Sequence, residues 1–294
     1  MAESVAPLVN VVPTGAALGA DIVGVDVRTD IDDLAFEQIL RAWYDHSVLR
    51  FRGQSLDDDS LAEFSRRFGV LDMAPTGRGG SPYDPSRPEI TVLSNIVVDG
   101  KALGALGNHE LVWHQDMSYN DLPPKASLLY ALEVPERGGD TQFYSLYKAY
   151  ETLPPALARR IEGLQCKHDA TRTSSGELRH GYDAEYSNEQ RPGAVHPLVV
   201  RHPGSGRKAL YLGRRPNAWI VGLSDADSDA LLDELWAHVH AHDFVWTQQW
   251  QTGDLVIWDN RCVLHRRGRL DPTTRRMMHR TQVQDEARPV AGWA

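Results

Sequence analysis

Cysteine, long apolar runs and an N-terminal leader are all scarce or missing in this chain of 294 residues. The two cysteines, Cys166 and Cys262, show no spacing motif, which favours a reduced intracellular compartment over a disulfide framework. No run approaches the roughly 18 apolar residues of a membrane span. The first ten residues have no basic segment followed by an apolar core, so no signal peptide is expected. These absences predict a soluble, cytoplasmic protein without a membrane partner.

Positive charge is in short supply as well. The chain has 31 Lys and Arg against 40 Asp and Glu, a formal net charge of -9. This balance argues against nucleic acid or an anionic membrane as a general partner. Any local basic cluster therefore needs a local explanation, such as a small anionic ligand.

What is present is a series of short apolar segments separated by Gly- and Pro-rich turns. Strands are expected in pairs or singly within 11–27, 47–51, 90–93, 127–132, 142–144, 198–200, 209–212, 244–250, 255–258 and 277–283. Helices are expected over 36–43 with Asp30 as N-cap, 60–68, 156–161, and after Ser224. No internal repeat or linker is visible. We therefore expect a single domain, 1–294, that is mainly β with flanking helices around a double-sheet barrel of the jelly-roll or cupin type.

One long stretch, 170–194, is polar and carries no periodicity. Structureless segments of this length within a compact domain are functional lids or disordered excursions. We expect a lid here.

The segment Trp113-His114-Gln115-Asp116 is the first sign of chemistry. In an extended segment, residues i and i+2 face the same side, so His114 and Asp116 can point at one ion. His265 is the best candidate for a third ligand. Two His and one carboxylate form the facial triad of non-haem Fe(II) oxygenases. A His-x-Asp pair alone is more often a surface or hydrogen-bonded pair, so further evidence is required.

Arginines downstream of His265 supply that evidence. If 276–280 is extended, Arg276 and Arg280 share one face and His279 points away. Buried unpaired charge is costly, whereas Arg binds carboxylates through two parallel hydrogen bonds. The pair therefore indicates a site for anions. The neighbouring tract 266–269 (RRGR) is expected to be a solvated basic strand.

Together these motifs resemble the family of taurine and 2,4-dichlorophenoxyacetate dioxygenases. The resemblance extends from the GADI segment at 19–22 to Arg280 and includes Gly138-Gly139-Asp140-Thr141 and Trp258-Asp259-Asn260-Arg261. It implies a double-stranded β-helix that uses Fe(II), 2-oxoglutarate and O2. It also implies oxidative decarboxylation to succinate and CO2, coupled to hydroxylation of a small anionic substrate.

The resemblance also assigns roles to individual residues. Iron would be held by His114, Asp116 and His265. Arg276 and Thr141 would bind the far carboxylate of 2-oxoglutarate, and Trp250 would line its pocket or belong to the core. Arg280 would lie near both the cosubstrate and the acidic group of the primary substrate.

The identity of the substrate is less constrained. A histidine that holds the sulfonate in taurine dioxygenase aligns with Ala74 here, which argues against taurine. The 93–101 segment looks closer to the phenoxyacetate-degrading members, so an aryloxyalkanoate or a related carboxylate is expected, with an alkyl sulfonate or sulfate ester as the alternative. Lys101, Arg78 and His109 are further candidate anion contacts, although a surface position suits each of them.

Two other classes of function remain open from the residues alone. A zinc hydrolase could use the same three ligands but would not need the arginine pair, and a 2-oxoglutarate sensor would bind without turnover. Relatives are usually dimers or tetramers, so a homo-oligomer is expected.

Overall fold

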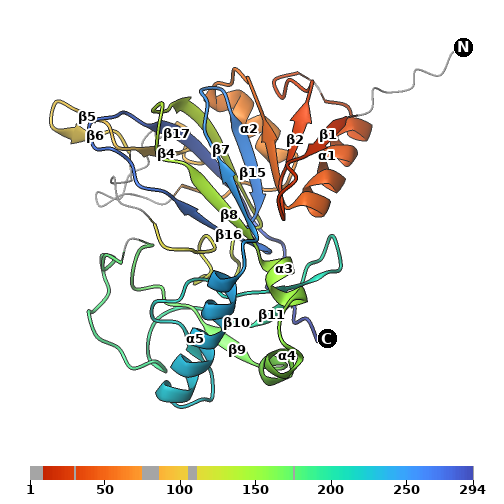
Figure 1. The fold of residues 1–294 in the computed structure, drawn as a ribbon. Coiled ribbons are helices and arrows are strands. Elements are labelled where there is room, and N and C mark those ends of the chain that lie inside the picture. Colours follow the sequence, from red (N-terminus) through yellow and green to blue (C-terminus); the bar gives the residue numbers. More distant parts are fainter. Residues whose placement is uncertain (1–8, 30, 75–85, 105–110, 175, 294) are drawn as a thin grey trace, which may run out of the picture.

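A computed structural model describes residues 9–29, 31–74, 86–104, 111–174 and 176–293. Its largest element is a seven-stranded sheet (Figure 1). In spatial order its strands are β1 (Asn10–Pro13), β2 (Ala20–Val23), β3 (Val48–Phe51), β15 (Leu255–Asp259), β7 (Ala126–Glu133), β17 (Met277–Val283) and β4 (Thr91–Ser94). The β2–β3 pair is parallel, and the other pairs in this sheet are antiparallel.

A second, three-stranded antiparallel sheet completes the barrel. It consists of β14 (Val245–Gln248), β8 (Thr141–Ser145) and β16 (Val263–Arg267). The smaller sheets are β10 (Val195–Pro197) with β9 (Gln165–Lys167) and β13 (Trp219–Ile220), β11 (Val199–Arg201) with β12 (Lys208–Leu210), and β5 (Val97–Val98) with β6 (Lys101–Ala102). The helices are α1 (Asp33–His46), α2 (Asp58–Arg66), α3 (Leu146–Glu151), α4 (Pro155–Ile161) and α5 (Asp225–Ala241).

Strand β7 shows how one apolar run serves two cores. Successive side chains of a strand point to opposite faces. Leu128 and Tyr130 therefore pack on the core beneath α1 and α2, whereas Leu129 and Ala131 pack on the core shared with the second sheet. A strand buried on both faces has continuous rather than alternating hydrophobicity. The prediction of a mainly-β double-sheet barrel with flanking helices is confirmed.

Figure 1 shows α1 and α2 beside the large sheet, and α3, α4 and α5 gathered with β9, β10 and β11 at the other end. The N-cap of α1 is Asp32, whose side chain accepts a hydrogen bond from the Ala35 amide at 2.7 Å. Asp30, the expected cap, lies outside the described residues. The predicted Ser224 cap of α5 is confirmed. In the described part of the chain, no helix is long and apolar enough to cross a membrane.

Several elements were not predicted, among them α3, β16 and the short strands β5, β6, β9 and β13. Helix α3 has six residues, too few for a periodic pattern to show. Strand β16, which carries His265, follows the turn at 259–262. Its two arginines interrupt the apolar pattern from which a strand is predicted. The described residues of the 170–194 segment contain neither helix nor strand, and one isolated bridge pairs Arg172 with Leu178.

Candidate metal centre and active site

His114, Asp116 and His265 lie together, with His265 on β16 and the other two on the segment that precedes β7. The Nε2 atom of His114 is 3.9 Å from Asp116 Oδ1, and the Nε2 atom of His265 is 3.7 Å from Asp116 Oδ2. All three side chains are buried, and their candidate ligand atoms lie within 4.8 Å of one another. The structure therefore brings together the three residues that the sequence nominated.

Backbone pairing explains how two distant histidines meet. His114 and His265 form an isolated antiparallel bridge in which each amide donates to the other's carbonyl, at 3.1 and 2.9 Å. Residues that exchange both hydrogen bonds lie directly opposite each other. Their ring centroids are consequently 4.2 Å apart.

The second ring nitrogen of His114 is also fixed. Its Nδ1 lies 2.8 Å from the carbonyl of Val112. A carbonyl can only accept, so Nδ1 carries the proton and the lone pair is on Nε2, the atom that faces Asp116.

Asp116 is held by a buried network on both its backbone and its carboxylate. The Asp116 amide donates to Asn260 Oδ1 at 2.7 Å, and Asn260 Nδ2 donates to the Asp116 carbonyl at 2.8 Å. Ser127 Oγ donates to Asp116 Oδ2 at 2.9 Å. Gln115, between the two ligands, exchanges hydrogen bonds with the backbone of Gly213. The sequence analysis missed Asn260, Ser127 and Gln115 as supports, although Asn260 lies in the quoted Trp-Asp-Asn-Arg motif.

The protonation states suit a cation. Burial lowers the pKa of His114, and burial together with the neighbouring His114 lowers the pKa of His265 to about 3. Burial by itself raises the pKa of Asp116, but the charge of Arg280, the two nearby imidazoles and the hydrogen bond from Ser127 bring it down to about 2. Neutral imidazoles and an ionised carboxylate are the forms that bind a metal ion.

The types of ligand atom in this site also suit Fe(II). Two imidazoles and one carboxylate on one side of an ion leave further positions open. A second group, His202, Asp259 and Cys262, is equally compact, but its ligand atoms are engaged. His202 accepts amide hydrogens of Gly204 and Ser205 at Nδ1, so Nε2 is the nitrogen that donates to Asp259, at 2.8 Å. This second group is therefore a structural hydrogen-bond network.

A cavity of about 530 Å³ opens beside the triad, within the range of small-molecule pockets. Arg276 and Thr141 line it, and both are buried. Burial and the nearby Arg267 lower the pKa of Arg276 to about 9, so its guanidinium is charged at neutral pH. Among the described residues, Arg276 Nε has no hydrogen-bond partner. A buried cation in this state suits an anionic ligand.

The Gly-Gly-Asp-Thr motif makes room for this arginine. Gly139 has φ +69°, and a Cβ there would lie 3.3 Å from Arg276 Cδ and 3.1 Å from Leu270 Cδ1. Trp250 is not among the described residues that line the cavity. Its indole Nε1 instead donates to Thr141 Oγ1 at 3.0 Å, which leaves the Thr141 hydroxyl hydrogen available to a ligand.

Arg280 lines the cavity on the metal side. Its NH1 lies 3.4 and 3.5 Å from the two carboxylate oxygens of Asp116. His279 points the other way, with Nδ1 2.5 Å from Asp58 Oδ1. The expected alternation of Arg276, His279 and Arg280 between the two faces is therefore present.

The expectation of a solvated tract at 266–269 is wrong for Arg267. This residue is 5% exposed and lines the cavity, because β16 places residues i and i+2, here His265 and Arg267, on the same face. That spacing could have revealed it. Lys101 is exposed in β6 and does not line the cavity, while Arg78 and His109 lie outside the described residues.

Comparisons with known proteins agree with this geometry. The family model "Taurine catabolism dioxygenase TauD, TfdA family" matches residues 7–282. The chain is 36% identical, over 94% of its length and 97% of the relative's, to the alpha-ketoglutarate-dependent 2,4-dichlorophenoxyacetate dioxygenase of Cupriavidus pinatubonensis. It is 32% identical, over 87% of its length and 83% of the relative's, to an alpha-ketoglutarate-dependent sulfate ester dioxygenase of Pseudomonas putida.

A solved structure is similar over nearly the whole chain. It is that of AAD-2 in complex with Mn(II) and N-oxalylglycine, at a TM-score of 0.78 and 27% identity. The match covers 97% of this chain and 100% of that one.

Proposed function

The chain belongs to the TauD/TfdA family of taurine catabolism dioxygenases, and from this premise we propose the roles of its site residues and the class of its substrate. It is an alpha-ketoglutarate-dependent dioxygenase whose reaction requires Fe(II), 2-oxoglutarate and O2. This enzyme class replaces the two alternatives considered from the sequence, a zinc hydrolase and a 2-oxoglutarate sensor.

We assign the iron to His114, Asp116 and His265. The observation that carries the assignment is the convergence of two Nε2 atoms on one carboxylate, beside a cavity that Arg276 and Arg280 line. When bound, the iron supplies the oxidative chemistry that couples decarboxylation of 2-oxoglutarate, to succinate and CO2, with hydroxylation of the substrate.

The far carboxylate of 2-oxoglutarate is assigned to Arg276 and Thr141. A guanidinium can grip a carboxylate through two parallel hydrogen bonds. The Thr141 oxygen already accepts from Trp250, so its hydroxyl donates to the same carboxylate. Trp250 thus acts through Thr141 by fixing the direction of that donor.

Arg280 has two tasks in this proposal. Its charge keeps Asp116 ionised, and its position beside the metal ligands places it near both the cosubstrate and the acidic group of the primary substrate. The apolar wall of Leu93, Leu129 and Trp258 receives the apolar part of the substrate and excludes water from the reacting carbon.

The substrate class proposed is a small acid of the aryloxyalkanoate type. Support comes from the similarity to the 2,4-dichlorophenoxyacetate dioxygenase over nearly the whole chain and from a cavity that combines an apolar wall with guanidinium groups. A sulfate ester is the second candidate, which the Pseudomonas putida relative favours. A single domain over 1–294 and a homo-oligomeric state complete the proposal.

The test measures succinate release and O2 uptake with Fe(II) and 2-oxoglutarate across 2,4-dichlorophenoxyacetate, an alkyl sulfate and taurine. We expect substrate-stimulated turnover with the first, or with the alkyl sulfate if the second candidate holds. His114→Ala should abolish turnover and keep the fold, whereas His240→Ala, an exposed histidine on α5, should change neither. Undiminished turnover in His114→Ala would reject the ligand assignment. Stimulation by taurine alone would reject the substrate class.

A further inference from the structure

The walls of the cavity carry more positive charge than the metal and the cosubstrate require. Five of the described residues that line it are arginines, and two carry carboxylates. One of these carboxylates, Asp116, is assigned to the metal, and the other is Glu177. The arginines are Arg179, Arg214, Arg267, Arg276 and Arg280.

Three of these arginines belong to the metal and cosubstrate side. Arg276 is assigned to the cosubstrate. Arg267 pairs across the β16–β8 ladder with Thr141, and its charge contributes to lowering the pKa of Arg276, so it lies at the same end. Arg280 lies 3.4 Å from Asp116 Oδ1.

Arg214 is committed to the protein. Its NH2 lies 3.2 Å from Asp169 Oδ2 and donates to the Asp169 carbonyl at 3.0 Å, and its NH1 donates to the Thr173 carbonyl. The Asp169 carboxylate is fully buried and also accepts from Asn217. This ion pair holds the base of the turn that follows.

Arg179 is the arginine of this set that has no role assigned above. Its Nε donates to the Arg172 carbonyl at 3.1 Å, and its guanidinium carbon lies 4.3 Å from the centre of the Tyr119 ring. Within the described chain, no carboxylate oxygen lies within 4.0 Å of its nitrogens, Glu177 included. Burial raises the pKa of Tyr119, whereas the charge of Arg179 and a side-chain hydrogen bond with it act in the opposite direction.

Hydrogen bonds between described residues fix the position of the Arg179 backbone. The Arg179 amide donates to the Thr171 carbonyl at 2.7 Å, and the Thr173 amide donates to the Glu177 carbonyl at 2.8 Å. Thr171 in turn donates from its hydroxyl and its amide to the buried Asp169 carboxylate. A binding group whose position is already fixed loses little entropy when a ligand arrives.

We propose that Arg179, stacked on Tyr119, is a specificity-determining residue that binds the anionic group of the primary substrate. The assignment rests on the proposed function, because it presumes an acidic substrate beside the metal. The group recognised is a carboxylate or a sulfate ester, since a guanidinium binds either through paired hydrogen bonds. Arg280, engaged with Asp116, then acts mainly on the metal and cosubstrate side.

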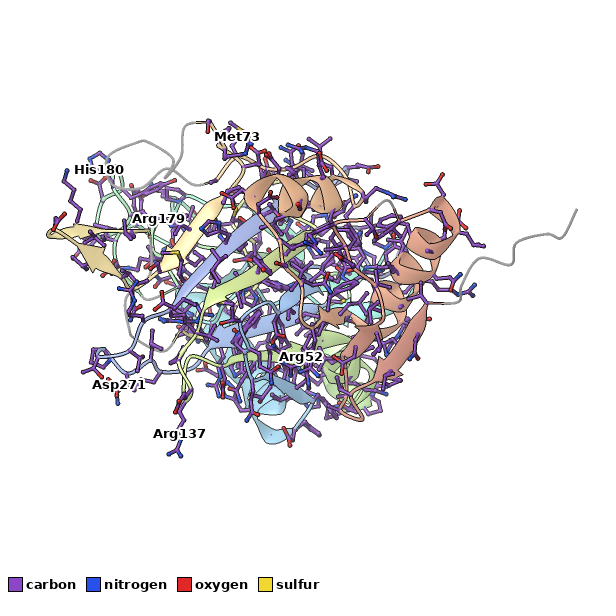
Figure 2. All side chains as sticks on the ribbon, turned by 90° about the horizontal axis from the view of Figure 1, so that it is seen from above. Arg52, Met73, Arg137, Arg179, His180 and Asp271 are labelled. Atoms are coloured by element: carbon purple, nitrogen blue, oxygen red, sulfur yellow. The ribbon has the colours of Figure 1, made fainter. Side chains whose placement is uncertain are left out.

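Its neighbour His180 provides a matched control. Figure 2 shows His180 at the periphery of the molecule, with Arg179 closer to the strands, and His180 does not line the cavity. The experiment titrates wild type, Arg179→Ala, Arg179→Lys and His180→Ala, each loaded with Mn(II) and N-oxalylglycine. The probes are 2,4-dichlorophenoxyacetate, octyl sulfate and the uncharged 2,4-dichlorophenoxyethanol, with calorimetric detection of binding.

Arg179→Ala should weaken binding of the acid that the wild type accepts by roughly 10- to 100-fold, the loss expected for a hydrogen bond to a charged group. The affinity of Arg179→Lys for this acid should lie between those of wild type and Arg179→Ala, and the affinity of His180→Ala should match that of wild type. The alcohol and N-oxalylglycine should bind all four proteins alike, which also reports that the variants are folded. The acid that binds, carboxylate or sulfate, identifies the group that is recognised.

Two results would overturn the assignment alone: unchanged acid affinity in Arg179→Ala, or an equal loss for acid and alcohol, which would mean that Arg179 only supports packing. A wild-type protein that binds neither acid would overturn the proposed substrate class, and this assignment with it. Succinate release without added substrate, measured in parallel, tests the dioxygenase chemistry separately.

Discussion

Asn260 holds the turn that carries Asp116, and a single substitution there tests how the metal ligands are positioned. Its Oδ1 accepts from the Asp116 amide at 2.7 Å, and its Nδ2 donates to the carbonyls of Asp116 and Pro124 at 2.8 and 2.9 Å. The side chain is buried. Asn260→Asp keeps its shape but replaces two donors with a carboxylate oxygen that faces two carbonyls.

The magnitude follows from those contacts. Each buried carbonyl left without a donor costs about 1–3 kcal/mol, so the variant should lose about 3–5 kcal/mol of unfolding free energy. Because domains have about 5–15 kcal/mol available, it should still fold. Residues that orient metal ligands typically contribute about 10- to 100-fold to metal affinity, and the same loss is expected here.

The assay combines urea unfolding with Mn(II) titration followed by the electron paramagnetic resonance signal of the free ion. Asn10→Asp, an exposed asparagine on the edge strand β1, makes the same chemical change without touching the site and should behave as wild type. If Asn260→Asp bound Mn(II) and resisted urea as wild type does, the account of how Asp116 is positioned would be refuted.

Two further predictions concern the cosubstrate anchor and a buried histidine. Arg276→Ala should raise the 2-oxoglutarate KM by roughly 30- to 1000-fold, since losing a charged partner of a buried anion costs about 2–4 kcal/mol. Arg275 is exposed and paired with Glu133, so Arg275→Ala should leave the KM unchanged. An equal KM in the two variants would count against Arg276 as the anchor of the cosubstrate. Burial lowers the pKa of His168 from 6.5 to about 3, so the unfolded state binds the extra proton between these values and stability falls as pH drops below 6.5. Urea unfolding at pH 6.5 and 5 should show a pH slope smaller by about 1 kcal/mol per unit in His168→Leu than in wild type, and identical slopes would contradict a neutral His168.

The positions of residues in helices and strands could be predicted where the hydrophobic pattern of the sequence is clear. The two-faced burial of β7 gives a continuous apolar run, and the Ser224 cap precedes a helix of 17 residues. Arg267 was predicted to be solvated because the tract was judged by its charge, although its spacing from His265 in β16 already places it in the site. A period of two was the better guide there than composition.

The meeting of Arg179 and Tyr119, which both lie on irregular segments, could not be predicted from the sequence. Asp169 contacts both Thr171 and Arg214 near these residues, and no local sequence pattern encodes such contacts. The three metal ligands were nominated from spacing and resemblance. The isolated bridge that sets His114 opposite His265 joins two segments that are far apart in the chain. Such a pairing cannot be predicted from the local sequence.

The measurement that tests the central claim most directly is a crystal structure of this chain with Mn(II) and N-oxalylglycine, the pair seen in the AAD-2 complex. We expect the ion to be coordinated by His114, Asp116 and His265, with the far carboxylate of N-oxalylglycine on Arg276. Either of two results would contradict the account: an ion bound instead at His202, Asp259 and Cys262, or side chains of His114, Asp116 and His265 that point away from the ion.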